Sequence, residues 1–493
     1  MRKFIRVLTT LIGLLTFASC APAPMERPGH FDFSPPEGYA PTLYDPGDVA
    51  DASAERLADS RPNIIFILTD DQPYYTVDYM PTVTDVLMAG GTVFENGFVT
   101  TPLCCPSRAS ILTGQYVHNH EVYTNRYPMG GAPKFDDTST IAVWLQEAGY
   151  RTAYFGKYLN DYELVEPKGK VPPGWDDWGA FLGKSGFQYY WDFTLSENGQ
   201  EIEYPKSKAN FGADVVTVKA VDFIHAARNE PFFLFVGYYN PHSPYISAPR
   251  HKDTFRGSSD WVWEPHEPPS LNEKDISDKP EYLSELSPLS EDELRIANVQ
   301  ILRSLLSVDD GVASILRALE QTGLDQNTVI VYLSDNGMTM GEHRFGVTKN
   351  CPYDECAHVP FIVYAPGLYP ARTDMHLVAN IDLAPTFADL ANAKVPDSVN
   401  GTSLVPLLVN ESVDWRDALL IEHWPTEEGV GAIIPEFYAV RTLEWKYVEY
   451  VTGECELYDL QNDPFELNNL AGKSAYAEMQ AELARRLEEL RNE

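Results

Sequence analysis

The stretch NIIFILTDD, residues 63–71, decides the fold of this chain. Residues 63–68 are a short run rich in β-branched and aromatic side chains, which is the pattern of a strand buried on both faces. Asp70 and Asp71 follow this run directly. In open α/β sheets, ligands gather beyond the carboxyl ends of the strands. We therefore expect a buried parallel strand that delivers two carboxylates to a functional edge.

Four further runs have the same composition and are predicted to be buried parallel strands: residues 152–155, 232–236, 329–333 and 361–364. Helical patterns lie between or beside them, at residues 139–148, 213–226, 291–321 and 382–390. Alternation of strands and helices predicts an α/β fold, with a large, mostly parallel central sheet flanked by helices.

Three of these strands also end in polar groups. The groups are Gly156-Lys157, Asn240-Pro241-His242 and Asp335-Asn336-Gly337. Any one of them is explained as a turn former at the end of a strand. Together with Asp70-Asp71 they place charged or imidazole groups at one edge of one sheet, and this indicates a ligand site.

The N-terminus predicts export. Three cationic residues precede an apolar run over residues 7–18, so residues 1–20 are interpreted as a signal peptide. A run of about 12 residues is too short for a membrane span, which takes about 20. Residues 17–20, FASC, resemble a bacterial lipobox that would leave Cys20 lipid-modified, and the alternative is an ordinary cleaved signal. Residues 21–60 are rich in Pro, Asp and Ala and are predicted to be a flexible linker.

Composition limits the classes of partner and the source of stability. The chain has 37 Lys plus Arg against 72 Asp plus Glu, a net charge of −35, which argues against nucleic acid as a partner. Apolar residues make up 44%, enough for a large core.

Of the six cysteines, Cys20 belongs to the signal and two are adjacent in a motif. One disulfide can form among the others, which are Cys351, Cys356 and Cys455.

The adjacent cysteines lie in LCCPSRASILTG, residues 103–114. Pro106 and Ser107 are predicted to open a helix over residues 107–112, because proline is accepted in a first turn. Residue 104 would then lie just before a helix N-terminus, where backbone N–H groups favour an anion. Hard oxygen donors of the kind that Ca²⁺ prefers, with Mg²⁺ as the alternative, come from Asp70, Asp71, Asp335 and Asn336.

CxPSR followed by LTG resembles the signature of the formylglycine-dependent type I sulfatases, which have an alkaline-phosphatase-like fold. The resemblance implies that a formylglycine-generating enzyme oxidises Cys104 to an aldehyde, which is then hydrated. One hydroxyl of the hydrate attacks the sulfur of a sulfate ester and the sugar alcohol leaves with a proton, after which the other hydroxyl collapses to the aldehyde and expels inorganic sulfate. It also implies a Ca²⁺ site in which the oxidised Cys104 joins Asp70, Asp71, Asp335 and Asn336.

The resemblance assigns roles to the cationic residues. Arg108 would hold the nucleophile and the metal carboxylates, and Lys157, His242 and Lys349 match positions that contact sulfate. Either His242 or Lys349 could protonate the leaving sugar oxygen. Many sulfatases read GKWHxG where this chain has GKYLN, so Leu159 replaces a histidine held to act as base. His118 and His120 are interpreted as pocket wall rather than as a metal pair.

Further motifs resemble one branch of the family, the N-acetylglucosamine-6-sulfatases and heparan sulfate 6-O-endosulfatases: CCPSRASILTGQYVHNHEVYTN at 104–125, GKYLN at 156–160, PPGWDDW at 172–178 and KNCPYDECAHVPF at 349–361. The resemblance covers residues 61 to about 471. It predicts a sulfated carbohydrate substrate with a 6-O-sulfate. The chain lacks the long basic insertion of the endo-acting enzymes, which favours exo action. The alternatives are a phosphate or phosphonate ester hydrolase and an inactive glycan-binding surface lipoprotein.

A change in pattern also divides the chain, because the predicted segments become shorter after Pro396. Residues 61–400 are predicted to be the catalytic domain, and residues 401–493 a smaller C-terminal α+β subdomain. The latter is expected to contain a hairpin at 437–448 and a final helix from residue 475.

Overall fold

The computed structural model describes residues 61–183, 186–255, 266–409, 412–426 and 433–493. The predicted signal peptide, Cys20 and the linker lie outside these ranges. Among the described residues, no helix combines the length and the apolar character that a membrane crossing requires.

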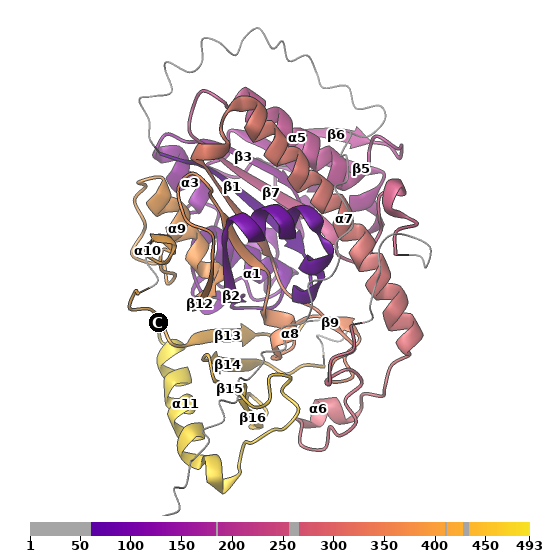
Figure 1. Cartoon of the computed structure of the whole chain (residues 1–493), viewed down its shortest axis with the longest axis vertical. Helices are drawn as coiled ribbons and strands as arrows, with labels where there is room; N and C mark the ends of the chain where they lie inside the picture. Colours follow the sequence, from indigo (N-terminus) through magenta and orange to yellow (C-terminus); the bar gives the residue numbers. More distant parts are fainter. Residues whose placement is uncertain (1–60, 184–185, 256–265, 410–411, 427–432) are drawn as a thin grey trace, which may run out of the picture. The chain divides into compact units, whose positions relative to one another are not determined.

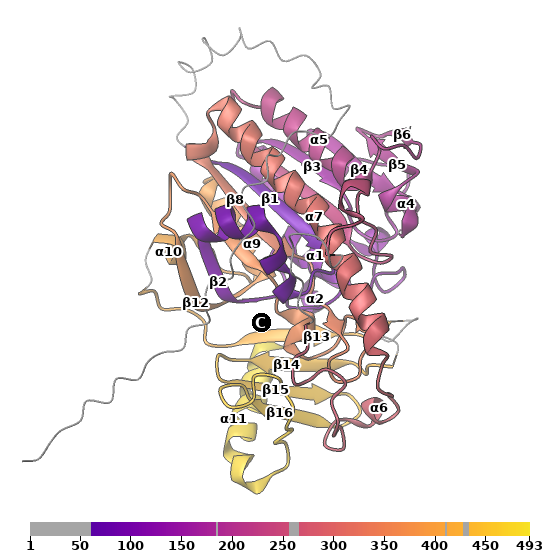
Figure 2. The same cartoon turned by 45° about the vertical axis from the view of Figure 1, so that its right-hand side comes forward.

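A ten-stranded mixed sheet forms the centre of the described chain (Figures 1 and 2). All five predicted strands are present in it, and β8, β1, β7 and β3 are adjacent and parallel. The strands, in sheet order, are β12 (Arg372–Ala379), β2 (Thr92–Phe98), β11 (Phe361–Tyr364), β8 (Thr328–Ser334), β1 (Asn63–Asp70), β7 (Phe232–Pro241), β3 (Arg151–Gly156), β4 (Asp177–Leu182), β5 (Phe193–Glu197) and β6 (Gln200–Tyr204).

The α/β prediction is confirmed, but the predicted direction of β11 is wrong. β11 runs antiparallel to both of its neighbours, β8 and β2. A continuous apolar run reports burial on both faces of a sheet, and burial is the same for either direction of the chain. The direction of β11 depends on how the chain returns from β8 to the sheet. The composition of the strand itself carries no information about this connection.

Helices cover both faces of the sheet, and β1 shows why. Its alternate side chains point to opposite faces: Ile65 and Ile67 pack in one apolar cluster, Phe66 and Leu68 in another. The first cluster includes α5 (Gly212–Ala226) and α7 (Glu291–Thr322), which lie side by side in Figure 2. The second includes α1 (Cys104–Thr113), α3 (Ile141–Glu147) and α9 (Leu383–Leu390). The four predicted helices are therefore present.

The long helix α7 has clear start and stop signals in the sequence. The Ser290 hydroxyl accepts a hydrogen bond from the backbone N–H of Glu293, and the first turn carries three acidic residues. Both features stabilise a helix N-terminus. Gly323 ends the helix with a φ of 67°, a conformation that glycine adopts without steric cost.

A separate four-stranded antiparallel sheet follows near the C-terminus, and its strands are β13 (Leu419–His423), β14 (Phe437–Arg441), β15 (Trp445–Tyr450) and β16 (Cys455–Asp459). The predicted hairpin is β14–β15, and the predicted last helix is α11 (Ala477–Leu490), which packs on this sheet (Figure 1). The domain boundary at residue 400 stays a prediction. Shorter elements are α2 (Val117–His120), α4 (Phe187–Tyr190), α6 (Glu281–Ser284), α8 (Asp354–Ala357), α10 (Val405–Val409), β9 (Thr339–Met340) and β10 (Val347–Thr348).

One of the three candidate disulfides is present. Cys351 and Cys356 are bonded and buried, whereas Cys455 is free and partly exposed. The backbone N–H of Gly337 donates to the carbonyl of Cys356, so the disulfide loop is attached to the segment that follows β8. The loop also begins two residues after Lys349.

We expect the double variant Cys351→Ser/Cys356→Ser to lose about 2 kcal/mol in free energy of unfolding, because a disulfide that closes a short loop restricts the unfolded chain by about this amount. Urea denaturation followed by far-UV circular dichroism measures the loss. Cys455→Ser is the control and should cost about 0.5 kcal/mol or less. An equal loss in both variants would contradict the assignment of the disulfide.

Candidate active site

Cys104 is the first residue of α1, and Leu103 is the N-cap. The predicted start at residue 107 is therefore wrong by one turn. The first N–H groups of a helix have no partner within the helix, so Pro106 is tolerated at the third position as well as the first. The N–H of Cys105 donates instead to the side-chain oxygen of Asn125, at 2.8 Å. Cys104 is thus held at a helix N-terminus, as the anion-site argument requires.

Arg108 is one turn further along α1 and is 2% exposed. Its Nε donates to Asp335 Oδ2 at 2.7 Å and its Nη1 donates to the backbone carbonyl of Lys157 at 2.7 Å. Its Nη2 lies 3.7 Å from Asp70 Oδ2. Burial alone would lower the pKa of Arg108, but the Asp335 and Asp70 carboxylates raise it. Arg108 is therefore a permanent buried cation that organises the loops after β8 and β3.

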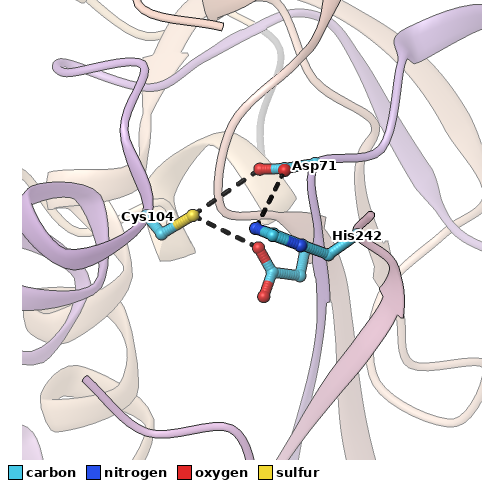
Figure 3. A group of neighbouring side chains, drawn as sticks. Asp71, Cys104 and His242 are labelled. Atoms are coloured by element: carbon cyan, nitrogen blue, oxygen red, sulfur yellow. Dashed lines mark hydrogen bonds and ion pairs between the residues drawn. The ribbon is translucent and has the colours of Figure 1, made fainter. Parts of the chain in front are cut away.

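Two carboxylates face the Cys104 side chain (Figure 3). The Cys104 Sγ lies 3.3 Å from Asp70 Oδ1 and 3.6 Å from Asp71 Oδ1. Asp71 Oδ1 also accepts a hydrogen bond from Asn336 Nδ2 at 2.8 Å, and the Asp71 backbone N–H donates to Asp335 at 3.1 Å. The structure therefore brings the four predicted metal ligands of β1 and β8 together beside residue 104.

Two lysines contact the same groups. Lys349 Nζ lies 2.6 Å from Cys104 Sγ and donates to Asp71, and Lys157 Nζ forms an ion pair with Asp70. Burial would lower the pKa of each lysine, but the carboxylates raise both above the usual range. Burial and the Asp70 charge raise the pKa of the Cys104 thiol well above its ordinary value. The unmodified Cys104 is therefore a neutral thiol that contacts the Lys349 ammonium group and the Asp70 carboxylate, and this carboxylate is itself paired with Lys157.

His242 completes the group at the end of β7. Its ring faces Asp71 (Figure 3), and its Nε2 lies 3.5 Å from Asp71 Oδ2. Its Nδ1 lies 2.7 Å from the hydroxyl of Tyr239. Burial lowers the pKa of His242, although Asp71 and Asp70 act in the opposite direction. β8, β1, β7 and β3 are adjacent, and the polar groups that follow them are connected by contacts around Cys104. The prediction that four strands deliver these groups to one edge of the sheet is therefore confirmed.

The residues present fit a divalent cation. Asp70, Asp71, Cys104 and His242 each offer a ligand atom within 4.8 Å of the others. The side-chain oxygen of Asn336 is buried and accepts no hydrogen bond from any described residue, which leaves it available to a cation. Hard oxygen donors of this kind suit Ca²⁺ or Mg²⁺. Asp335 is engaged by Arg108 and by the Asp71 backbone, so it would contribute an oxygen that already accepts a hydrogen bond.

Charge balance determines what a bound cation would do to the site. Three carboxylates and three basic side chains meet here: Asp70, Asp71, Asp335, Arg108, Lys157 and Lys349. They neutralise one another, and an added divalent cation would leave the centre positive. A positive centre attracts an anionic ester.

Some residues singled out in the sequence lie elsewhere. Leu159 is buried in an apolar cluster. His118 Nδ1 contacts both oxygens of buried Glu422, and His120 Nε2 lies 3.0 Å from the Ser110 hydroxyl. Neither histidine belongs to the metal-ligand group found among the described residues.

Sequence reasoning missed Asn125 and Tyr239. Asn125 comes 21 residues after Cys104, in a stretch without periodicity. Tyr239 belongs to the apolar run of β7, where an aromatic side chain is expected in the core. The signal was one of position: Asn125 is the last residue of the motif at 104–125, and Tyr239 directly precedes Asn240-Pro241-His242.

Comparison with known proteins agrees with this arrangement. The Sulfatase family profile matches residues 62–393, and a profile described as "N-sulphoglucosamine sulphohydrolase, C-terminal" matches residues 341–493. The chain belongs to the sulfatase family, and the alkaline-phosphatase-like fold expected for that family is confirmed.

Individual relatives cover most of the chain. A putative extracellular sulfatase Sulf-1 homolog of Caenorhabditis elegans is 35% identical over 74% of this chain and 53% of its own length, so the chain spans about half of that relative. Human N-acetylglucosamine-6-sulfatase is 32% identical over 83% of this chain and 81% of its own. A solved structure described as BT4656 in complex with its substrate D-glucosamine-2-N,6-O-disulfate is 28% identical, with a TM-score of 0.75 over 88% of this chain and 98% of that one.

We expect Asp71→Asn to weaken Ca²⁺ binding about tenfold or more, because a lost charged ligand costs at least ~1.4 kcal/mol. Isothermal titration calorimetry on the purified chain measures this without any substrate. Asp374→Asn, the same change at a buried carboxylate of edge strand β12, is the control. Unchanged binding in Asp71→Asn, or equal weakening in both variants, would contradict the site.

Proposed function

We propose that the protein hydrolyses sulfate esters on sugars, and that its substrate carries a 6-O-sulfate on N-acetylglucosamine or glucosamine. The observation that carries the proposal is the surroundings of Cys104. In a chain of the sulfatase family, the signature residue lies at a helix N-terminus, in contact with two carboxylates and with the ammonium group of Lys349, and Lys157 pairs with one of these carboxylates. The names of the human relative and of the BT4656 complex support the choice of sugar and position.

Each protein group has a role in this reaction. Lys349 contacts residue 104, and Lys157 pairs with Asp70 beside it, so their ammonium groups can bind the oxygens of a sulfate that approaches residue 104. Cations placed where charge develops lower the barrier of such a transfer. Arg108 touches the carboxylates and the Lys157 backbone, and it therefore orients the other groups. Lys349 and His242 are the groups able to exchange a proton with the leaving sugar.

Maturation requires a second enzyme. A formylglycine-generating enzyme would oxidise Cys104, and the modified side chain would supply the nucleophile while Ca²⁺, or Mg²⁺ in its place, offsets the charge of the sulfate. The ligands would be Asp70, Asp71, Asp335, Asn336 and residue 104, and the catalytic residues Cys104, Arg108, Lys157, His242 and Lys349. The contacts around Cys104 described above support both assignments.

We place the enzyme in the cell envelope or outside the cell, with a lipid on Cys20 as its attachment. The predicted signal at residues 1–20 supports export, as does the name of the extracellular sulfatase relative. Residues 61–400 would form the catalytic domain, which the Sulfatase profile at 62–393 supports, and residues 401–493 the C-terminal subdomain. The chain would act at the ends of short glycans, because at low ionic strength its net charge of −35 repels long polyanions.

Cys104→Ala should abolish activity, whereas Cys105→Ala should retain most of it, because only Cys104 contacts the carboxylates and Lys349. Mass spectrometry of the tryptic peptide spanning residue 104 should show the modification in Cys105→Ala and not in Cys104→Ala. Equal loss of activity in the two variants, or modification of residue 105, would overturn the assignment.

The modified enzyme should release sulfate from 6-O-sulfated N-acetylglucosamine faster than from 3- or 4-sulfated sugars, and faster than from the interior of heparin. Ion chromatography of free sulfate measures all of these rates. Faster release from heparin would contradict exo action, and preference for a sulfated galactose or uronic acid would contradict the sugar. Faster cleavage of an aryl phosphate than of an aryl sulfate would favour the phosphoesterase alternative, and no turnover at all would favour a binding protein.

A further inference from the structure

Three aromatic side chains, Tyr123, Trp424 and Tyr438, form a row of rings that the proposed reaction does not use. The centroids of Tyr123 and Trp424 are 4.6 Å apart, and those of Trp424 and Tyr438 are 5.8 Å apart. All three side chains are half-buried. They come from the loop after α2, the loop after β13, and β14, so the tertiary fold builds this aromatic row from three separate segments.

The first ring of the row is held close to the start of α1. Tyr123 comes two residues before Asn125, whose side-chain oxygen accepts from the N–H of Cys105 at 2.8 Å. Val122 and Thr124 are buried, whereas Tyr123 and Asn125 are partly exposed, so the latter two share one face of the segment. Because two residues of chain span about 7 Å at most, the Tyr123 backbone lies within this distance of the residue that contacts Cys105.

The second ring is attached to the same stretch of chain from the four-stranded sheet. Trp424 comes two residues after Glu422, whose N–H donates to the carbonyl of Thr100 at 2.9 Å. Glu422 is fully buried, and its carboxylate accepts from the N–H of Val117 and contacts His118. The end of β13 is therefore fixed against α2 as well. The two attachment points, residues 100 and 105, lie on either side of the nucleophile position in the sequence.

The polar ends of the first two rings have no partner in the part of the chain that the structure describes. The indole N–H of Trp424 and the hydroxyl of Tyr123 make no hydrogen bond with any described residue. By contrast, the indole N–H groups of Trp144, Trp178 and Trp415 all donate within the chain. A half-exposed ring with a free polar group combines an apolar surface with a hydrogen-bonding group. Such a surface suits a sugar, which has an apolar face of C–H groups and a rim of hydroxyls.

The charges around the first ring disfavour an anionic sugar. Charged groups that act on the Tyr123 hydroxyl are the carboxylates of Glu121, Glu422 and Glu436 and the ammonium of Lys134. Lys134 is already paired with Glu121 at 2.9 Å. Arg491 lies over Tyr438, at the other end of the row. A uronic acid or a second sulfated sugar beside Tyr123 would therefore meet like charges, which are costly at a binding surface, whereas an uncharged sugar would not.

We propose that the aromatic row binds the uncharged sugar that is linked to the sulfated one, with the apolar face of this sugar on Tyr123 and Trp424. The inference rests on the proposed sulfate ester hydrolysis and adds a second binding position beside Cys104. Its consequence is that a disaccharide with a neutral neighbour is a better substrate than the monosaccharide, because binding energy from remote parts of a substrate is used at the reacting centre. A neighbouring uronic acid removes this advantage.

Sulfate release from three 6-O-sulfated N-acetylglucosamine substrates tests the row: the monosaccharide, a disaccharide with a neutral hexose, and a disaccharide with a uronic acid. We expect Trp424→Ala to lower kcat/KM about tenfold for the neutral disaccharide and to leave that for the monosaccharide within about twofold. Trp445→Ala is the matched control, because Trp445 is also half-buried in the four-stranded sheet but packs against Tyr476 instead. It should change neither rate.

Equal losses on the monosaccharide and the neutral disaccharide in Trp424→Ala would refute the proposal. A wild type that prefers the uronic acid disaccharide to the neutral one would refute it as well.

Saturation-transfer NMR tests the contact in the folded chain without turnover and without any change to the row. The Cys104→Ser chain is mixed with the neutral disaccharide, and the aromatic protons of the protein are irradiated. We expect the C–H protons on one face of the neighbouring sugar to receive saturation. Saturation confined to the sulfated sugar would overturn the proposal, whatever the behaviour of the Trp424 variant.

The proposed hydrolysis and the aromatic row fail in different ways. A chain that binds the disaccharide through the neighbouring sugar but releases no sulfate after modification retains the row as a sugar site and refutes only the hydrolysis. A chain that cleaves all three substrates at equal rates, with no saturation of the neighbouring sugar, refutes the row and leaves the hydrolysis intact.

Discussion

The ion pair between Arg108 and Asp335 is the interaction on which the rest of the site depends. Both groups are buried, and the guanidinium also donates to the Lys157 backbone. One side chain of α1 therefore fixes the loops after β8 and β3 relative to Cys104. Removing one partner of such a pair leaves an uncompensated buried charge and typically costs about 3–5 kcal/mol. The buried positive charge of Arg108 has to be neutralised, and this requirement fixes the positions of Lys157 and of the Asp335-Asn336 segment.

The order of strands in the sheet makes this charge cluster possible. β8, β1, β7 and β3 are neighbours and run parallel, so their carboxyl ends lie side by side. Each strand leads into one part of the site: β8 into Asp335 and Asn336, β1 into Asp70 and Asp71, β7 into His242, and β3 into Lys157. Two further contacts hold the segment that carries Lys349. They are the disulfide between Cys351 and Cys356 and an ion pair of the buried Lys446. Lys446 pairs with Asp354 of α8, so strand β15 of the C-terminal sheet holds the segment that carries Lys349.

Much of this could be predicted from the sequence, and the failures have physical reasons. Buried strands reveal themselves by composition, and the polar groups after them by position, so the site edge was predictable. The direction of β11 was not, because burial does not depend on chain direction. The start of α1 was misplaced because proline is accepted throughout a first turn. Asn125 acts through a contact with Cys105, 20 residues away in the chain, and Tyr239 acts through a contact with His242 from within an apolar strand. A single sequence does not report such contacts.

The strong negative charge of the chain and the cationic character of its site act over different distances. Lys157 and Lys349 act on groups a few ångströms away, where salt screens little because water is excluded. The net charge of −35 acts on a distant polyanion, and at physiological ionic strength this field decays within about 8 Å. Repulsion of long sulfated chains is therefore strong only in dilute salt. At higher ionic strength, selection among sulfated sugars would therefore depend on contacts inside the site, where Lys157, Lys349 and His242 lie, and not on the charge of the surface.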